Sequence, residues 1–311
     1  MVNSPGQSRT SRATAALALT VVLWAMAFPA IRVGVAAYGP VGLSVLRLLV
    51  ASVALAVAAP LLGVRRPRRA DLPLILLCGL TGMTAYQLLL NWGEVHVPAG
   101  TASLLVSTAP VFSVLLAWLF LRERLSWPTV LGSGVALAGS ALIALSGGDA
   151  HYATAAWAVL AAALVQGVYH FACTPLLRRY TGLEVACYAM WTGTAVLLPF
   201  APAALGGIGA APLGATASVL LLGLLPSAVG FVTWGYAVAR HSVAVATAAL
   251  YLVPVVALGV AFGWLGERPA PVELVGGLIS IAGVALVHLA GRRAPAPTPA
   301  ELPAAAPATP R

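Results

Sequence analysis

The sequence contains no lysine and few charged residues of any kind. Only 8% of its 311 residues are charged, whereas soluble domains have roughly 25%. With 60% hydrophobic residues, this composition excludes an ordinary soluble protein and indicates a membrane protein. The net charge of +9 comes entirely from arginines, which form short clusters between apolar runs. Membrane loops have this distribution, and a nucleic-acid-binding groove does not.

Motifs for metal binding and catalysis are also missing. The three cysteines, Cys78, Cys173 and Cys187, have no CxxC spacing, so neither a disulfide framework nor a zinc site is predicted. The apolar runs contain no aspartate, and the chain has neither HExxH nor a Walker A motif. The sequence therefore predicts no enzyme, no cofactor, no metal and no ATP-driven pump.

Ten apolar runs are long enough to be membrane spans, which need about 20 residues each. A lipid-exposed backbone must satisfy its own hydrogen bonds, so these runs are predicted to be helices. The fold class is therefore predicted as an all-α membrane protein with ten transmembrane helices. The predicted spans are 14–34, 41–62, 72–92, 98–121, 129–146, 153–175, 183–203, 215–237, 244–265 and 271–290.

Arginine counts predict the orientation of these spans. If the N-terminus lies inside, fourteen arginines fall in the inner loops and tails, whereas the outer loops contain only Arg268. Because cytoplasmic loops carry the positive excess, both termini are predicted to be cytoplasmic. The segment 1–13 becomes an N-terminal tail, and the Pro/Ala-rich segment 291–311 is predicted to be disordered. Abundant alanine without lysine suggests a high-GC bacterial genome and hence the inner (plasma) membrane.

The chain carries an internal repeat at an offset of 144 residues. Between Ala102 and Leu142, 12 of 41 positions are identical to their counterparts. The repeat divides the chain into residues 14–146 and 153–290, joined by an outer linker at 147–152. Five spans per unit is an odd number, so the two units are predicted to be inverted, as in many secondary transporters. The aligned pairs are Pro110 with Pro254, Glu123 with Glu267, Gly132 with Gly276 and Gly139 with Gly283.

These features resemble a known family. Ten spans, a five-plus-five duplication, "LWAMAFPAIRVG", "LSVLRLLVAS" and two Pro-to-Glu hairpins are similar to EamA-type proteins of the drug/metabolite transporter superfamily. The resemblance covers about residues 14–290. Family members often have Trp-Gly in the first span, where this chain has Trp24-Ala25. The resemblance implies transport of small metabolites or drugs, often amino-acid-like, and frequently export.

The repeated residues are predicted to have structural roles. Pro110 and Pro254 each remove a helix hydrogen bond, which predicts a bend that shapes a cavity. Glu123 and Glu267 precede the fifth and tenth spans, where a helix N-terminus favours a carboxylate, so they are predicted to cap or lock turns. Close helix packing is predicted at four glycines. Such packing can also support a homodimer, so the sequence leaves both a monomer and a homodimer open. These glycines are Gly132, Gly139, Gly276 and Gly283.

Arg47 is the leading candidate for substrate binding, because it lies about six residues inside the second span. Three roles fit it: binding a substrate carboxylate or phosphate, pairing with a carbonyl at a helix end, or snorkelling to the outer surface. Glu94 is a possible neutralising partner of Arg47 or Arg32. Aromatic walls with a few polar groups suit an apolar or zwitterionic small molecule. The other candidates are Trp24, Tyr86, Gln87, Asn91, Gln166, Tyr169, His170 and Trp234.

These features together predict a secondary transporter that works by alternating access on a small-molecule substrate in a lipid bilayer. The alternative is a membrane scaffold or sensor without transport activity. The substrate, the direction and the coupling are not determined by the sequence. No carboxylate lies at the middle of a predicted span, which leaves uniport, exchange and proton coupling through His170 open.

Overall fold

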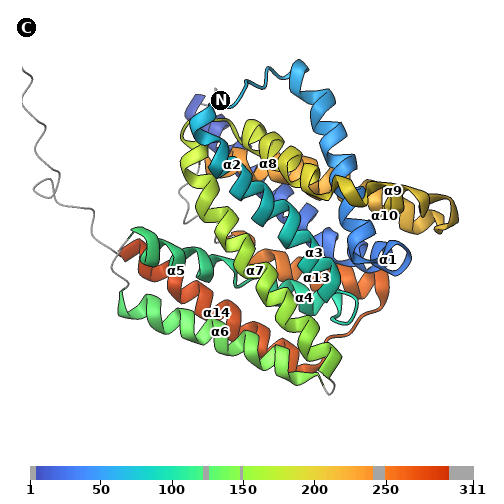
Figure 1. Cartoon of the computed structure of the whole chain (residues 1–311). Coiled ribbons are helices and arrows are strands. Elements are labelled where there is room, and N and C mark those ends of the chain that lie inside the picture. Colours follow the sequence, from blue (N-terminus) through green and yellow to red (C-terminus); the bar gives the residue numbers. More distant parts are fainter. Residues whose placement is uncertain (1–4, 122–125, 148–149, 241–248, 294–311) are drawn as a thin grey trace, which may run out of the picture.

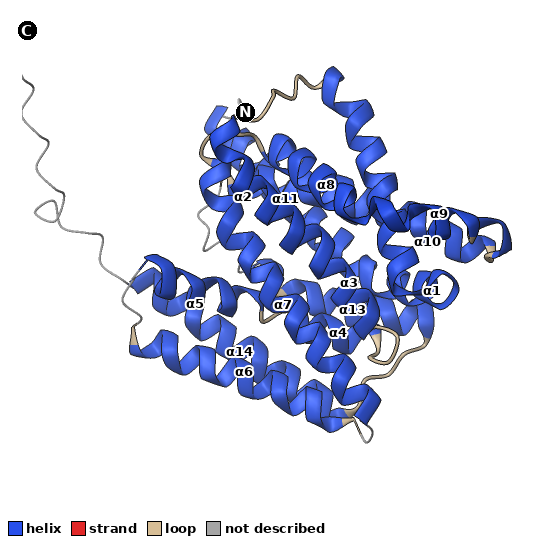
Figure 2. Ribbon diagram, in the orientation of Figure 1, coloured by secondary structure: helices blue, strands red, loops and turns tan. Residues whose placement is uncertain are grey.

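The computed structural model describes residues 5–121, 126–147, 150–240 and 249–293. Within these ranges every regular element is helical (Figures 1 and 2). Seven helical stretches of the described chain are long and apolar enough to cross a membrane, and two shorter apolar helices, Leu252–Leu265 and Pro271–Val287, follow them. The predicted all-α class is therefore confirmed.

The first helix covers both of the first two predicted spans. Helix α1 runs over Pro5–Leu61, and its interior residue Gly39 has a φ of 65° and a ψ of 172°. A residue without a Cβ adopts this positive φ without steric strain. Gly39 therefore divides α1 into two helical arms near the predicted boundary. Because the helix begins at Pro5, most of the segment predicted as an N-terminal tail is helical.

The third and eighth predicted spans each contain a π-helical segment. In the third, η2 (Gly79–Ala85) lies between α2 (Leu72–Cys78) and α3 (Tyr86–Gly93). The eighth span has the same sequence of elements, and its π-helical segment begins 144 residues after the first, at Gly223. Such segments are rare and occur frequently at functional sites. These elements are α10 (Leu213–Leu222), η5 (Gly223–Gly230) and α11 (Phe231–Val238).

Pro110 and Pro254 lie at helix starts rather than inside continuous helices. The fourth predicted span is divided into α4 (Ala99–Val106) and α5 (Ala109–Leu121). In the ninth, α13 (Leu252–Leu265) follows a turn residue at position 251. Proline costs no hydrogen bond in the first turn of a helix, where the N–H has no intrahelical partner. The predicted bend is therefore a complete break, after which a new helix begins.

Hydroxyl groups satisfy carbonyl oxygens at the break between α4 and α5. Ser107 Oγ donates to the Leu104 oxygen at 2.6 Å, and Thr108 Oγ1 donates to the Leu105 oxygen at 2.7 Å. Side chains of this kind re-satisfy backbone groups that a broken membrane helix exposes. The sequence "STAP" thus ends one helix and starts the next without leaving these carbonyls unpaired.

The remaining helices complete the bundle with boundaries within a few residues of the prediction. Helix α14 continues to Arg293, past the predicted end of the last span, and residues 294–311, including most of the tail predicted to be disordered, lie outside the described residues. The remaining elements are η1 (Arg69–Asp71), α6 (Trp127–Ser146), α7 (Ala150–Leu177), α8 (Gly182–Leu197), η3 (Leu198–Phe200), α9 (Ala201–Gly206), η4 (Ile208–Ala210) and α14 (Pro271–Arg293).

Helices α6 and α14 pack side by side through glycines (Figure 1). A Cβ added to Gly132 would lie 2.7 Å from the Gly283 oxygen, and one added to Gly139 would lie 2.5 Å from the Gly276 oxygen. The four predicted glycines therefore do allow close packing, but they use it within one chain. Their faces are already covered, so they do not provide the dimer contact that the sequence suggested.

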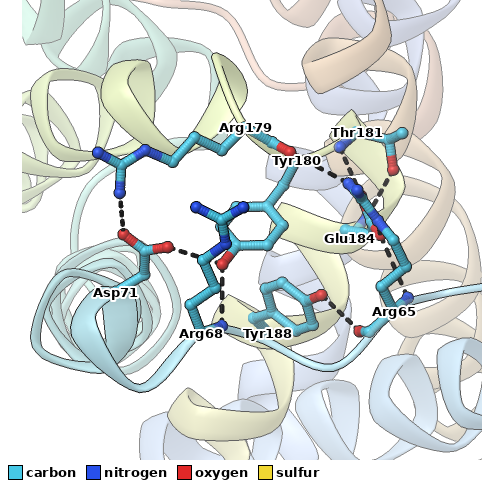
Figure 3. A network of polar contacts seen from close by, with 8 residues as sticks. All are labelled: Arg65, Arg68, Asp71, Arg179, Tyr180, Thr181, Glu184 and Tyr188. Carbon is cyan, nitrogen blue, oxygen red and sulfur yellow. Dashed lines mark hydrogen bonds and ion pairs between the residues drawn. The ribbon is translucent and has the colours of Figure 1, made fainter. Parts of the chain in front are cut away.

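A polar network joins the loop after α1 to the turn between α7 and α8 (Figure 3). Glu184 is buried in the first turn of α8 and accepts from Arg65 Nε at 2.6 Å and from the Thr181 N–H at 2.7 Å. The carboxylate raises the pKa of the Arg65 guanidinium, chiefly through this hydrogen bond. The pair therefore stays ionised at neutral pH.

The other part of the network centres on Asp71. Its carboxylate accepts from Arg179 Nη1 at 2.6 Å and from the Tyr180 hydroxyl at 2.7 Å. Sequence reasoning did not identify these acidic residues, although Thr181-x-x-Glu184 is the pattern of a capping box. The network ties residues 65–71 to residues 179–184, which are more than 100 positions apart.

We expect Glu184→Ala to lower the free energy of unfolding by about 2 kcal/mol, since it removes a helix cap and an ion pair. The change is measurable as a lower melting temperature of purified protein in detergent. Glu184→Gln is the matched control, because an amide oxygen still accepts from the Thr181 N–H, and it should lose less. Equal melting temperatures for wild type and Glu184→Ala would contradict this.

Candidate functional site: a central cavity

A cavity lies between helices of the bundle, with about 710 Å³ of empty space including the part open to solvent. Its walls come from both sequence units, residues 14–146 and 153–290. The lining residues are Trp24, Ala27, Phe28, Ile31, Arg47, Tyr86, Gln87, Leu90, Ser103, Val106, Ser107, Ala109, Pro110, Gln166, His170, Pro226, Phe231, Leu250, Val253 and Pro254.

Arg47 is the cation of this cavity. Its side chain is buried, with 3% exposed, and its Nε and Nη2 donate to Ser227 Oγ at 3.3 and 3.1 Å. Its Nη1 has no hydrogen-bond partner within the described part of the chain. The snorkelling alternative is therefore wrong. A guanidinium with a free N–H inside an apolar cavity is suited to bind a carboxylate or phosphate.

Two glutamines and a histidine provide further polar groups. The described residues offer no hydrogen-bond partner to four buried atoms: both amide atoms of Gln87, Oε1 of Gln166 and Nδ1 of His170. Gln166 Nε2 and His170 Nε2 lie 3.3 Å apart, one helical turn from each other on α7. Buried polar groups are normally paired, so unpaired ones on a cavity wall point to a polar ligand or water.

Aromatic rings form the apolar part of the wall. Trp24 packs against Phe231 and Trp234, with ring centroids 5.3 and 5.5 Å away. Trp24 Nε1 donates to the Pro226 carbonyl at 3.2 Å, which fixes the indole against η5. The cavity therefore combines one cation, a few amide and imidazole groups and a mostly apolar surface, as expected for a small zwitterionic or apolar molecule.

The structure brings six of the nine predicted binding residues to the cavity: Trp24, Arg47, Tyr86, Gln87, Gln166 and His170. Three others are buried but are not part of its lining. Asn91 donates to Ser44 Oγ at 2.8 Å, Tyr169 packs edge-on against Phe231, and Trp234 lies beside Trp24 and His170. Tyr169 and Trp234 therefore support residues that line the wall, whereas the partner of Asn91 lies outside the lining. Pro110 and Pro254 are themselves lining residues.

Sequence reasoning missed several residues of the site. Polar residues and prolines inside apolar runs tend to face the protein interior. That signal was present at Ser103 and Ser107, just before Pro110, and at Pro226-Ser227 in the eighth span. Phe28 and Phe231 carried no comparable signal, because phenylalanine in a membrane span also packs against lipid.

Glu267 caps a helix, but not the one predicted. Its Oε2 accepts from the Ala99 N–H at 2.8 Å, at the start of α4, and its Oε1 lies 3.2 Å from Arg32 Nε. The first turn of α14 instead carries Glu273, whose Oε2 accepts from the Ala270 N–H at 2.8 Å. Glu123, the repeat counterpart of Glu267, lies outside the described residues.

The predicted neutralisation of Arg32 by Glu94 is not found. Arg32 Nη1 donates to the main-chain oxygens of Glu94 and Val95, while its ion pair is with Glu267. Among the described residues, the Glu94 carboxylate makes no salt bridge with Arg32 or Arg47. Glu94 is nevertheless fully buried.

A bundle of long apolar helices is the architecture of a multi-pass membrane protein. The EamA-like transporter family matches residues 12–145 and again residues 153–289. The chain belongs to this family and is a membrane transporter, which confirms the resemblance seen in the sequence.

Two relatives and one solved structure extend this comparison. The chain is 67% identical to a probable terminal-alkyne amino-acid exporter of Streptantibioticus cattleyicolor, over 94% of this chain and 99% of that protein. It is 37% identical to the uncharacterized transporter YdfC of Bacillus subtilis, over 87% and 89% of the two chains. A crystal structure with 21% identity superposes with a TM-score of 0.60, over 91% of this chain and 99% of that one, which shows a shared fold.

Proposed function

We propose that this protein exports small amino-acid-like compounds by alternating access between two inverted five-helix repeats. The observation that carries the proposal is the unpaired Nη1 of Arg47 on the wall of a largely apolar cavity. The proposal includes ten membrane spans, both termini in the cytoplasm and a position in a bacterial inner membrane. The repeats are residues 14–146 and 153–290.

Three observations support the inverted repeats. The family matches the chain twice, once in each unit. The π-helical segments begin at Gly79 and Gly223, at the same offset as the sequence repeat. The glycine contacts are also symmetric under the repeat. Gly132 contacts Gly283, and the repeat counterparts of these two residues, Gly276 and Gly139, contact each other. A two-fold relation between the units would produce this symmetry.

The proposed substrate is an α-amino acid with a terminal alkyne, the class that names the relative with 67% identity. Its carboxylate would bind Arg47 Nη1, because charge-assisted hydrogen bonds to a guanidinium are strong. Its ammonium would find acceptors in the unpaired amide oxygens of Gln87 and Gln166. The short alkyne would lie against the rings of Trp24 and Phe231.

A transport assay tests this proposal. Proteoliposomes with the purified protein are loaded with radiolabelled propargylglycine, a small amino acid whose side chain ends in an alkyne, and efflux is compared with protein-free liposomes. We expect efflux and counterflow exchange above the liposome background, with competition by unlabelled propargylglycine. If neither propargylglycine nor a panel of other amino acids and drugs is exchanged, the transporter proposal fails in favour of a scaffold or sensor.

A further inference from the structure

Glu94 is a buried carboxylate with no hydrogen-bond partner among the described residues, and it lies one helical turn beyond the cavity residue Leu90. It follows the last residue of α3, and its side chain is 0% exposed. Gln87 and Leu90 line the cavity. Positions 87, 90 and 94 are spaced by three and four residues, so they share one face of the helix. Glu94 therefore continues the face of α3 that forms the cavity wall.

The charged and titratable groups around Glu94 come from three parts of the chain. Arg32 is ion-paired with Glu267, and Arg47 donates to the Ser227 hydroxyl rather than to Glu94. An ionised carboxylate buried without a partner is strongly unfavourable, so the conformation described suits a protonated Glu94. The groups that interact electrostatically with it are Arg32 and Arg47 of α1, Tyr86 of α3 and Glu267 after α13.

We propose that Glu94 is a proton-binding site, and that its proton is exchanged for the ammonium group of the transported amino acid. The inference rests on the proposed function. An amino acid brings one carboxylate, which Arg47 can bind, and one ammonium. The ammonium and a proton are alternative ways to neutralise an ionised Glu94, so the two ligands compete. Competition of this kind gives exchange of substrate for a proton, rather than joint transport.

The first test measures binding of radiolabelled propargylglycine to the purified protein between pH 5 and pH 8. Linkage predicts that affinity falls as pH falls, by up to about tenfold per pH unit where Glu94 titrates. Glu94→Gln should remove this dependence. The matched control is Glu273→Gln, which alters a carboxylate that already has partners and should keep the dependence. His170→Gln tests the other titratable group of the cavity, and this variant should also keep the pH dependence of binding.

The second test measures coupling in proteoliposomes. Acidifying the external medium should accelerate wild-type efflux of the propargylglycine loaded inside. Trapped pyranine should report protons moving inward at the same time. Glu94→Gln should lose both responses to the gradient in any counterflow exchange that it retains at equal pH. Wild-type responses in Glu94→Gln, or a gradient that slows wild-type efflux, would overturn the inference. Absence of exchange in the wild type would instead overturn the proposed function.

Infrared difference spectroscopy covers the case in which Glu94→Gln binds and transports nothing. The wild-type protein in lipid should show a protonated carboxyl stretch at neutral pH that is present in Glu273→Gln and missing from Glu94→Gln. If the spectra of wild type and Glu94→Gln have the same protonated carboxyl band, Glu94 does not hold the proton and the inference is wrong.

Discussion

Replacing Arg47 by methionine is expected to reduce kcat/KM for propargylglycine efflux about 10- to 100-fold, while the protein remains folded. The reason is that Arg47 is the cation of the cavity and has an unpaired Nη1. Hydrogen bonds to charged groups contribute about 1.5–3 kcal/mol, which corresponds to this loss. Initial efflux rates over a range of internal propargylglycine concentrations measure the effect.

Stability distinguishes this role of Arg47 from a structural one. Burying an arginine without an ionic partner is unfavourable, and an apolar residue of similar length often stabilises such a site. We therefore expect the melting temperature of Arg47→Met to equal or exceed that of the wild type. Arg66→Met is the matched control, because Arg66 is exposed outside the cavity, and it should transport normally. Normal efflux by Arg47→Met would show that the substrate does not depend on this cation.

Replacing Gly139 by leucine is expected to prevent assembly of the bundle. A Cβ at Gly139 already meets the Gly276 oxygen and the Ser280 nitrogen at 2.5 Å. Both are backbone atoms of α14, which cannot move aside as a flexible side chain can. Forcing a large side chain into this contact should cost about 3 kcal/mol or more, a large part of the roughly 5–15 kcal/mol that stabilises a folded protein. Size-exclusion profiles of the expressed variant measure the loss.

Gly134 supplies the matched control on the same helix. A Cβ at this position meets no atom within 4 Å, and leucine has a higher helix propensity than glycine. Gly134→Leu should therefore give wild-type yield and a wild-type elution profile. If Gly139→Leu behaves like Gly134→Leu, the close contact between α6 and α14 is not required for folding.

The helices and most of their ends were predictable, because hydropathy and length are local properties of the chain. The break before Pro110 was predictable as a bend, but its form was not, since it depends on the hydroxyls of Ser107 and Thr108. The π-helical segments were not foreseen, because an extra residue per turn depends on tertiary packing such as that between Gly82 and Tyr169.

Prediction of the site was limited by tertiary packing. Gln166, Tyr169 and His170 are spaced by three and four residues and so share one side of α7, but Tyr169 packs against Phe231 and is not part of the cavity lining. Asn91 lies one turn after Gln87 on α3, but its amide donates to Ser44 and it is not part of the cavity lining. Glu267 caps α4, a helix more than 160 positions away in sequence, and local sequence contains no information about such a partner.

The glycine contacts between α6 and α14 also limit how the protein can move. One helix belongs to residues 14–146 and the other to residues 153–290, and they meet backbone to backbone at Gly132–Gly283 and Gly139–Gly276. Separating or sliding them would lose these backbone contacts together with the hydrogen bond between the Ser140 and Ser280 hydroxyls. The α6–α14 pair therefore connects the two units rigidly. Opening of the cavity then requires movement of the helices that line it.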